Sequence, residues 1–259
     1  MADRITKTVA FANQKGGVGK TTSAVNFAAA LGKAGKETLL IDFDPQGNAT
    51  SALGISKRNV KISTYDVVVS GADINSAVIK TKFAGLSVVP SSINLAAAEI
   101  ELAEEAGRES ILKNAIASLS KSYDCIVIDC PPSLGILTLN ALTAADGVIV
   151  PMVCEYFALE GLSQLTYTLE RIRRSYNPSL QIYGVMLTMY DGRLNLTAQV
   201  VAELKKHFSD KLFPTAIPRS VRLSEAPSHG QPIIYYDKYS KGSFAYQQVT
   251  KEAMSRIWR

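Results

Sequence analysis

Short and almost uninterrupted apolar runs alternate along this chain with longer segments that have the periodicity of helices. Continuous apolar runs are typical of parallel strands that are covered on both faces. The pattern predicts strands at residues 8–12, 38–42, 86–90, 125–129, 147–151, 182–188 and 213–217. It predicts helices at residues 23–31, 96–105, 108–121, 159–176, 196–208 and 243–258.

The regular alternation of these elements predicts an α/β fold. Strands that are separated by helices form a doubly wound, mostly parallel sheet with helices on both faces. The chain contains no linker rich in proline, glycine or serine, no internal repeat and no low-complexity tract. We therefore expect a single domain over residues 1–259.

The most specific motif lies between the first predicted strand and the first predicted helix. Residues 15–22 read Lys-Gly-Gly-Val-Gly-Lys-Thr-Thr. A glycine-rich turn at a helix N-terminus points backbone N–H groups at an anion, and the helix dipole favours phosphate there. The alternative is a glycine turn in an α/β protein that binds no nucleotide. The predicted phosphate loop consists of Lys15, Gly16, Gly17, Val18, Gly19, Lys20, Thr21 and Thr22.

Within this loop, two side chains have chemistry suited to a nucleoside triphosphate. Lys20 is placed to lie along the β- and γ-phosphates, and the Thr21 hydroxyl is placed to bind Mg²⁺.

Acidic residues follow two of the predicted strands. Asp42 and Asp44 stand at and just beyond the end of one strand, and Asp129 ends another. Ligands of open α/β sheets bind at the carboxyl ends of the strands. We expect Asp129 to hold Mg²⁺ through water and Asp42 to lie near the same ion. The alternative for the Asp42 segment is a capped loop with two solvated acids.

The phosphate loop departs from the common pattern G-x-x-x-x-G-K-[ST]. Gln14 stands where that pattern has its first glycine, and an additional lysine, Lys15, follows. The form K-G-G-x-G-K-[ST] resembles the deviant Walker A motif of the ParA/MinD/nitrogenase iron-protein class of ATPases. The resemblance implies a nucleotide shared across a homodimer, with Lys15 reaching the partner subunit's ATP. It assigns Lys15 and Lys20 to the catalytic machinery.

Two further segments resemble the switches of this class. Residues 42–48 resemble switch I, with the pattern D-x-D-P-Q-G-N, and residues 131–135 resemble switch II. The resemblance implies that Asp44 positions the attacking water. It also implies ATP and Mg²⁺ as cofactors.

A narrower resemblance, to the small chromosomal ParA proteins of the Soj type, runs over nearly the whole chain. It includes residues 155–161 and 217–232. In that group the segment corresponding to Pro218 and Arg219 lies beside the adenine.

The Soj-type resemblance also concerns partners. It implies that Arg193 and Arg222 bind double-stranded DNA without sequence preference. It further implies an ATP-bound homodimer, a ParB/Spo0J-type protein that stimulates slow hydrolysis, and a location on the nucleoid in the cytoplasm.

Charge is distributed unevenly along the chain, whose formal net charge is +5. Residues 1–150 carry 14 basic and 14 acidic side chains, whereas residues 171–259 carry 14 basic and 6 acidic ones. A basic C-terminal third beside a neutral remainder favours a polyanionic partner, either nucleic acid or an anionic membrane. An ordinary solvated surface is the alternative.

Three functions are compatible with these observations. The first is a DNA-binding ATPase switch for chromosome or plasmid partitioning. The second is a MinD-like, membrane-associated positioning ATPase, which needs a C-terminal amphipathic helix. We interpret Met254, Ile257 and Trp258 as core contacts and expect no stable membrane association. The third is a metabolic enzyme or iron–sulfur reductase, although Cys125 and Cys154 lie in or just after strands.

Overall fold

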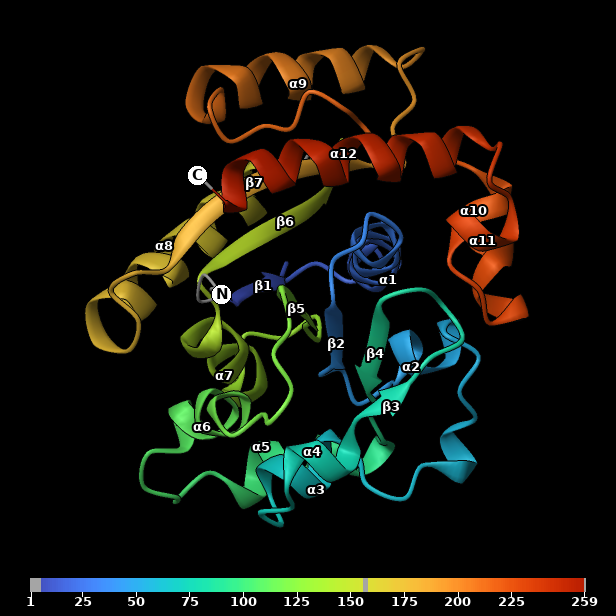
Figure 1. The fold of residues 1–259 in the computed structure, drawn as a ribbon. Coiled ribbons are helices and arrows are strands. Elements are labelled where there is room, and N and C mark those ends of the chain that lie inside the picture. The colour runs from blue at the N-terminus through green and yellow to red at the C-terminus, as the bar shows by residue number, and fades with distance from the viewer. Residues whose placement is uncertain (1–5, 156–157, 259) are drawn as a thin grey trace.

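One twisted sheet with helices on both faces organises the computed structural model, which describes residues 6–155 and 158–258 (Figure 1). The sheet order is β3-β4-β2-β5-β1-β6-β7, and every neighbouring pair is parallel except β3 and β4. The strands are β1 (Lys7–Phe11), β2 (Thr38–Asp42), β3 (Ile79–Lys80), β4 (Leu86–Val89), β5 (Cys125–Asp129), β6 (Gly147–Val153) and β7 (Gln181–Thr188). The expected doubly wound parallel sheet is therefore confirmed.

Helices of very different length connect these strands. The α-helices are α1 (Lys20–Lys33), α2 (Asn48–Ala52), α3 (Thr64–Val68), α4 (Ile74–Ala77), α5 (Ala98–Glu101), α6 (Ile111–Ala117), α7 (Ile136–Ala144), α8 (Ala158–Ser175), α9 (Asn195–Phe208), α10 (Val221–Glu225), α11 (Ile233–Tyr236) and α12 (Lys241–Ile257). Short 3-10 turns are η1 (Lys57–Asn59), η2 (Ile93–Ala97), η3 (Arg108–Ser110) and η4 (Ala226–His229).

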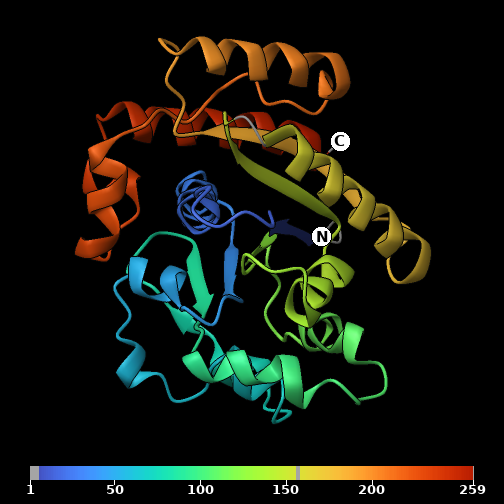
Figure 2. The same ribbon diagram turned by 180° about the vertical axis from the view of Figure 1, so that it is seen from behind.

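The two faces of the sheet pack into separate hydrophobic cores. Successive strand residues point to opposite faces, so Val9 and Phe11 pack into one core and Ala10 into the other. The first core contains α1, α2, α10, α11 and α12, and the second contains residues of α3 to α9. Figure 2 shows α1 enclosed between the strands and the C-terminal helices. Burial on both faces explains why the strands are apolar throughout.

The strand register brings the carboxyl ends of β1, β2 and β5 to the same level of the sheet. Phe11 of β1 lies opposite Asp129 of β5, and Asp42 of β2 lies opposite Asp129 on the other side. Because these strands are parallel, the phosphate-loop segment after β1 and both acids leave the sheet at the same edge.

Six of the seven predicted strands are confirmed, with small differences at their ends. The prediction at residues 213–217 is wrong. The amide of Phe213 donates to a carbonyl of β7 at 2.9 Å, but Pro214 has no N–H, and Thr215 donates its own N–H to Glu252 of α12 at 3.2 Å. The ladder is interrupted there, so the segment runs beside β7 without forming a strand.

The long helices were predicted well, and the short ones were not. The prediction at residues 96–105 is wrong in extent, because only the four residues of α5 form an α-helix there. The prediction at residues 108–121 is reduced to η3 and α6. Helix α7 was missed.

The C-terminal helix packs as expected. Ile257 is buried in the core, and Met254 and Trp258 are partly buried against it. No helix within the described ranges is both long and apolar enough to cross a membrane.

Candidate nucleotide-binding site

The loop between β1 and α1 has the backbone of an anion cradle. Gly17 and Gly19 have φ values of 73° and 83°, in the left-handed region that side chains disfavour. Gly19 is the residue before α1, and its carbonyl accepts the first helical bond, from the Ser23 amide, at 2.9 Å. The amides of the first helical turn therefore remain available at the loop, where they favour an anion.

Side chains from the ends of neighbouring strands hold this loop in place. The Asn13 amide donates to the carbonyl of Pro151 in β6 at 2.7 Å, and its oxygen accepts the Lys15 N–H at 3.0 Å. The hydroxyl of Thr188, the last residue of β7, donates to the Val18 carbonyl at 2.8 Å. Contacts with β6 and β7 thus hold the cradle in place before any ligand binds. Neither contact could be predicted from the motif at residues 15–22.

Lys20 is buried and lies inside the loop. Only 6% of the residue is exposed, and its Nζ donates to the carbonyl of Lys15 at 3.0 Å. Burial lowers the pKa of this ammonium, and the nearby acids Asp129 and Asp44 counteract that effect. A cation held at the centre of the cradle is suited to a polyphosphate.

Asp129 is fully buried at the end of β5, and neither of its carboxylate oxygens has a hydrogen-bond partner in residues 6–155 and 158–258. Burial raises its pKa well above the usual range, and the charge of Asp42 raises it further. Thr21 and Lys20 act in the opposite direction. A buried carboxylate without partners is what a cation site requires before the cation binds.

Asp42 is equally buried but has partners. Its Oδ2 accepts hydrogen bonds from the N–H and the hydroxyl of Thr50, at 2.7 and 2.6 Å. Burial raises the pKa of Asp42 to about 6, although the bonds from Thr50 oppose this. Asp44 lies in the turn that follows, where its Oδ1 accepts the Gln46 N–H at 2.9 Å.

The Lys15 side chain pairs with a residue outside its own loop. Its ammonium forms an ion pair with Glu155, which follows β6, and both side chains are about half exposed. Glu155 begins the predicted signature segment 155–161, of which Tyr156 and Phe157 lie outside the described residues. The pairing of Glu155 with the second lysine could not be inferred from either motif alone.

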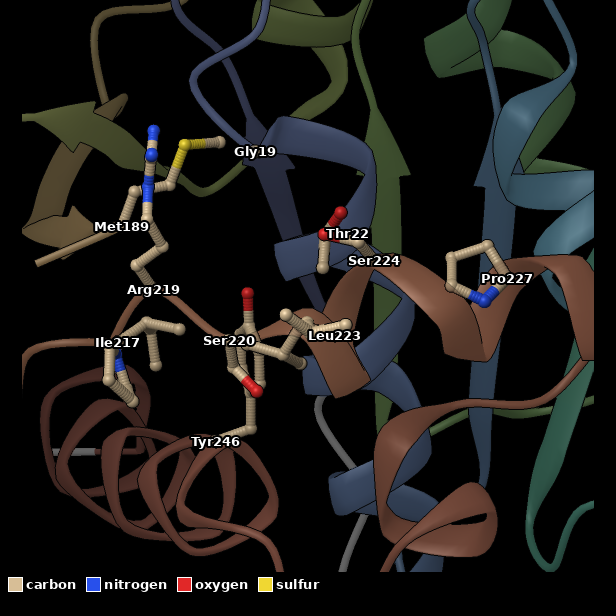
Figure 3. Close-up of a pocket in the computed structure, with 12 residues that line it drawn as sticks. Gly19, Thr22, Met189, Ile217, Arg219, Ser220, Leu223, Ser224, Pro227 and Tyr246 are labelled. Atoms are coloured by element: carbon tan, nitrogen blue, oxygen red, sulfur yellow. The ribbon is translucent and has the colours of Figure 1, made fainter.

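A cavity of about 450 Å³ opens beside the phosphate loop (Figure 3). Figure 3 shows Met189 and Arg219 at one end of it and Pro227 at the other, with Thr22 of α1 between them. Pro218 also lines this cavity. Both residues that were predicted to lie beside an adenine, Pro218 and Arg219, are therefore brought next to the loop, although their contact with a base stays a prediction.

The cavity contains residues that no motif indicated. Met189, directly after β7, has a φ of 49° and is the only non-glycine residue with positive φ in the described part of the chain. Tyr246 of α12 contributes a ring to the cavity, and its hydroxyl lies 3.1 Å from that of Ser23. A strained backbone at a cavity rim is a common property of ligand sites.

The two arginines that were predicted to bind DNA are exposed but not isolated. Arg193 donates two hydrogen bonds to Asp191, at 2.8 and 2.6 Å, and lowers the pKa of that carboxyl to about 2. Arg222 lies 3.1 Å from Glu225 and 3.6 Å from Asp237.

Other basic side chains of the C-terminal third are less neutralised. The following form no ion pair with an acidic side chain within the described ranges: Arg171, Arg174, Lys205, Arg219, Lys238, Lys241 and Lys251.

No cluster of three or more His, Cys, Asp or Glu side chains in the described part of the chain is arranged to hold a metal ion. Mg²⁺ needs no such protein cage, because it usually binds one or two protein ligands together with water and phosphate oxygens. Thr21 and Asp129 fit that role.

Comparison with proteins of known sequence identifies close relatives. A family model described as an AAA domain matches residues 6–182. The sporulation initiation inhibitor protein Soj of Bacillus subtilis is 54% identical over 246 residues, which cover 95% of this chain and 97% of that protein. The chromosome partitioning protein ParA of Caulobacter vibrioides is 49% identical over 252 residues, covering 96% and 94%.

Solved structures share the fold. A Mycobacterium smegmatis protein named cobyrinic acid a,c-diamide synthase, with bound ADP and magnesium, has a TM-score of 0.86 and 37% identity, covering 98% of this chain and 96% of that one. A putative plasmid partition protein of Borrelia burgdorferi bound to AMPPNP has a TM-score of 0.83 and 28% identity, covering 98% and 100%. The septum site-determining protein MinD of Pyrococcus horikoshii with Mg-ADP has 0.78 and 26%, covering 96% of each chain.

Proposed function

Because this chain belongs to the Soj/ParA family of chromosome-partitioning ATPases, we propose that it is an ATP-controlled dimerising switch that binds DNA without sequence preference. Hydrolysis is stimulated by a ParB-type partner and ends the DNA-bound state. The observation that carries the proposal is the pre-formed phosphate cradle with two lysines, one buried in it and one directed out of it.

ATP binding uses groups that the fold has already placed. The amides at the N-terminus of α1 and the Lys20 ammonium bind the phosphates, and the cavity lined by Pro218 and Arg219 receives the adenine. Asp44, almost buried beside the loop, orients and deprotonates the attacking water.

Asp129 is suited to bind Mg²⁺. The metal, when bound with the nucleotide, neutralises charge on the β- and γ-phosphates. The Thr21 hydroxyl and the carboxylate of Asp129, whose oxygens have no hydrogen-bond partner in the described part of the chain, would hold it. Asp42 lies beside Asp129 in register and contributes to the negative field of the site.

Dimerisation depends on Lys15. Its side chain pairs with Glu155, outside its own phosphate loop, and is half exposed, so it is free to reach a second subunit once that pair opens. An exposed ion pair contributes little stability, up to about 1 kcal/mol, so a phosphate group of a partner's nucleotide can compete for the ammonium.

DNA binding follows from the basic C-terminal third of the chain. Exposed arginines contact phosphates well and give affinity without sequence readout. Arg193 and Arg222 exchange their carboxylate partners for phosphates, and other basic side chains of the C-terminal third add positive charge.

The membrane alternative is disfavoured, because the apolar residues that would contact lipid at the C-terminus, Met254, Ile257 and Trp258, pack against the core. The metabolic alternative is disfavoured by sequence, since identity to the diamide synthase is 37% but reaches 54% for Soj.

The test is a gel shift with a duplex of random sequence and the Asp44→Ala variant, which should bind ATP, dimerise and hydrolyse little. Binding should require ATP rather than ADP. If each subunit neutralises about two to four phosphates, the slope of log K against log salt is roughly −4 to −7. Arg193→Ala and Arg222→Ala should each flatten this slope, whereas the control Lys113→Ala, on α6, should not.

Two variants in the phosphate loop separate binding from dimerisation. Lys20→Ala should abolish ATP binding, whereas Lys15→Ala should bind ATP as a monomer; light scattering with ATP reports both. Equal DNA binding with ADP and ATP, or ATP-dependent sedimentation with anionic liposomes and not with DNA, would contradict the proposal.

A further inference from the structure

The loop that carries Asp44 is closed by one buried polar contact. β2 ends at Asp42, and the chain returns to it eight residues later, when Thr50 of α2 donates both its N–H and its hydroxyl to Asp42 Oδ2. The Asp44 N–H approaches Oδ1 of the same carboxylate at 3.4 Å. Asp42 and Thr50 are both fully buried.

The two buried acids at this edge of the sheet therefore differ in what they can do. Asp42 and Asp129 are opposite each other in register, yet Oδ2 of Asp42 is committed to Thr50, while both oxygens of Asp129 have no partner in the described part of the chain. A carboxylate that is already hydrogen-bonded by the protein is suited to hold a loop, and one without partners is suited to a ligand.

The Thr50 hydroxyl joins a third segment to this contact. It donates to Asp42 and accepts the N–H of Ser91, just beyond β4, at 3.0 Å. One hydroxyl thus connects the end of β2, the start of α2 and the segment after β4. A methyl group in its place would leave the Ser91 N–H without that acceptor and would remove one of the two bonds to Asp42 Oδ2.

We propose that Asp42 and Thr50 form an anchor for the loop of residues 42–50, and that the Thr50 hydroxyl positions Asp44 for hydrolysis. The proposal rests on the proposed function, in which Asp44 orients the attacking water. Thr50 acts through Asp42 and lines neither the phosphate loop nor the cavity beside it. Its loss therefore affects turnover and not ATP affinity.

On the N-terminal side of Asp44 the loop is also tied to the sheet, because Phe43 is fully buried and its N–H donates to the Asp129 carbonyl of β5 at 3.0 Å. Inside the loop, the Gln46 N–H bonds to the Asp44 side chain and the Gly47 N–H bonds to the Asp44 carbonyl, at 2.9 and 2.8 Å. These two bonds shape the turn locally, and the Lys57 ammonium donates to the Gln46 carbonyl at 2.6 Å. On the C-terminal side of Asp44, the bonds from Thr50 to Asp42 return the loop to the end of β2. A small displacement of a catalytic group lowers a rate by about 100-fold, so the anchor has a measurable consequence.

The experiment compares Thr50→Val, which keeps the shape, with Thr50→Ser, which keeps the hydroxyl. The control is Thr64→Val, because the Thr64 hydroxyl is also buried but has no hydrogen-bond partner in the described ranges. Amide hydrogen exchange of residues 44–50 is measured without nucleotide, ATP affinity with a fluorescent analogue, and hydrolysis at saturating ATP.

Thr50→Val should exchange at least about tenfold faster in the loop and hydrolyse ATP roughly 10- to 100-fold more slowly, with ATP affinity within about twofold of wild type. Thr50→Ser should restore exchange and turnover, and Thr64→Val should leave all three unchanged. If Thr50→Val folds poorly, Thr50→Ala, which cannot overpack the site, is measured below its melting temperature.

Wild-type loop exchange or wild-type turnover in Thr50→Val would overturn the anchor. So would a loss of ATP affinity equal to the loss of rate. A failure of the proposed function is distinguishable, because Asp44→Ala would then hydrolyse ATP like wild type whatever the exchange of the loop shows.

Discussion

Replacing Asp129 by asparagine should stabilise the nucleotide-free protein. Asp129 is fully buried, and neither of its oxygens has a hydrogen-bond partner in the described part of the chain, so burial of its negative charge destabilises the fold. The nearby Lys20 ammonium and Thr21 hydroxyl offset only part of this penalty. Its raised pKa, caused by burial and by the charge of Asp42, reports the same penalty. Asparagine has nearly the same shape and no charge.

The expected stabilisation follows from the cost of burying the Asp129 carboxylate without a hydrogen-bond partner among the described residues. A buried polar group without a partner costs about 1–3 kcal/mol. Asparagine remains polar and recovers part of this, so the free energy of unfolding should rise by about 1–2 kcal/mol. For a chain of this size, that corresponds to an increase of about 2–8 °C in the midpoint of thermal unfolding.

The assay is thermal unfolding followed by circular dichroism, without nucleotide and with a chelator. Asp124→Asn is the matched control, because Asp124 is a buried acid beside the other end of β5 that accepts the Glu37 N–H at 2.8 Å and lies 3.9 Å from Lys36. Since Asp124 has partners, its replacement should lower the midpoint. With Mg²⁺ and ATP, wild type should gain more stability than Asp129→Asn.

The pH dependence of the stability provides a second test of whether Asp129→Asn stabilises the protein. The pKa of Asp129 is higher in the folded than in the unfolded protein, so the folded state binds the proton more tightly. The penalty is absent below the unfolded pKa, where the carboxyl is protonated in both states, and it grows as the pH rises from the unfolded pKa to the higher folded pKa. The advantage of Asp129→Asn should therefore shrink as the pH falls. A lower midpoint for Asp129→Asn at neutral pH, or an advantage that does not change with pH, would refute the reasoning.

Three further predictions concern contacts around the site. Glu155→Ala should release Lys15 and shift ATP-dependent dimerisation, followed by light scattering, to up to about 30-fold lower protein concentration, because two pairs of up to about 1 kcal/mol each open in a homodimer; an unchanged midpoint would show that the ion pair does not compete with the dimer. Glu99→Ala should raise exchange of the Ile136 amide about tenfold, because the Glu99 carboxylate accepts this N–H at 3.0 Å, whereas Glu99→Gln should keep protection. Gly32→Ala should destabilise the fold by more than about 2 kcal/mol in urea unfolding, since a methyl group would overlap a backbone carbonyl of the neighbouring loop; stabilisation would show that helix propensity outweighs the overlap.

The sequence determined the sheet and the phosphate loop, because both depend on local patterns. Short apolar runs indicate strands of a sheet that is covered on both faces, and six of the seven predicted strands form. Glycines with positive φ, such as Gly17 and Gly19, allow the tight turn of this loop, and adjacent residues therefore indicate it in the sequence. The strand predicted at residues 213–217 does not form, and the reason is also local: Pro214 has no N–H to donate to a neighbouring strand.

Tertiary structure alone decided which groups meet. The supports of the phosphate loop come from Asn13 and Thr188, and the latter is 170 positions away from the carbonyl it holds. Asp42 and Asp129 look alike in sequence, each as an acid at the end of an apolar strand. Only the return of Thr50 makes one an anchored group and leaves the other without partners.

The same holds for charge. Composition shows that the C-terminal third is basic, but not that Arg193 is paired with Asp191 or that Lys15 is paired with Glu155. Hydrogen bonds and ion pairs act over a few ångströms, so they depend on how the chain packs and not on how it is patterned. The local sequence patterns therefore predict the fold and the phosphate-binding chemistry. Tertiary packing decides which charged side chains have partners within the protein and which can bind a ligand.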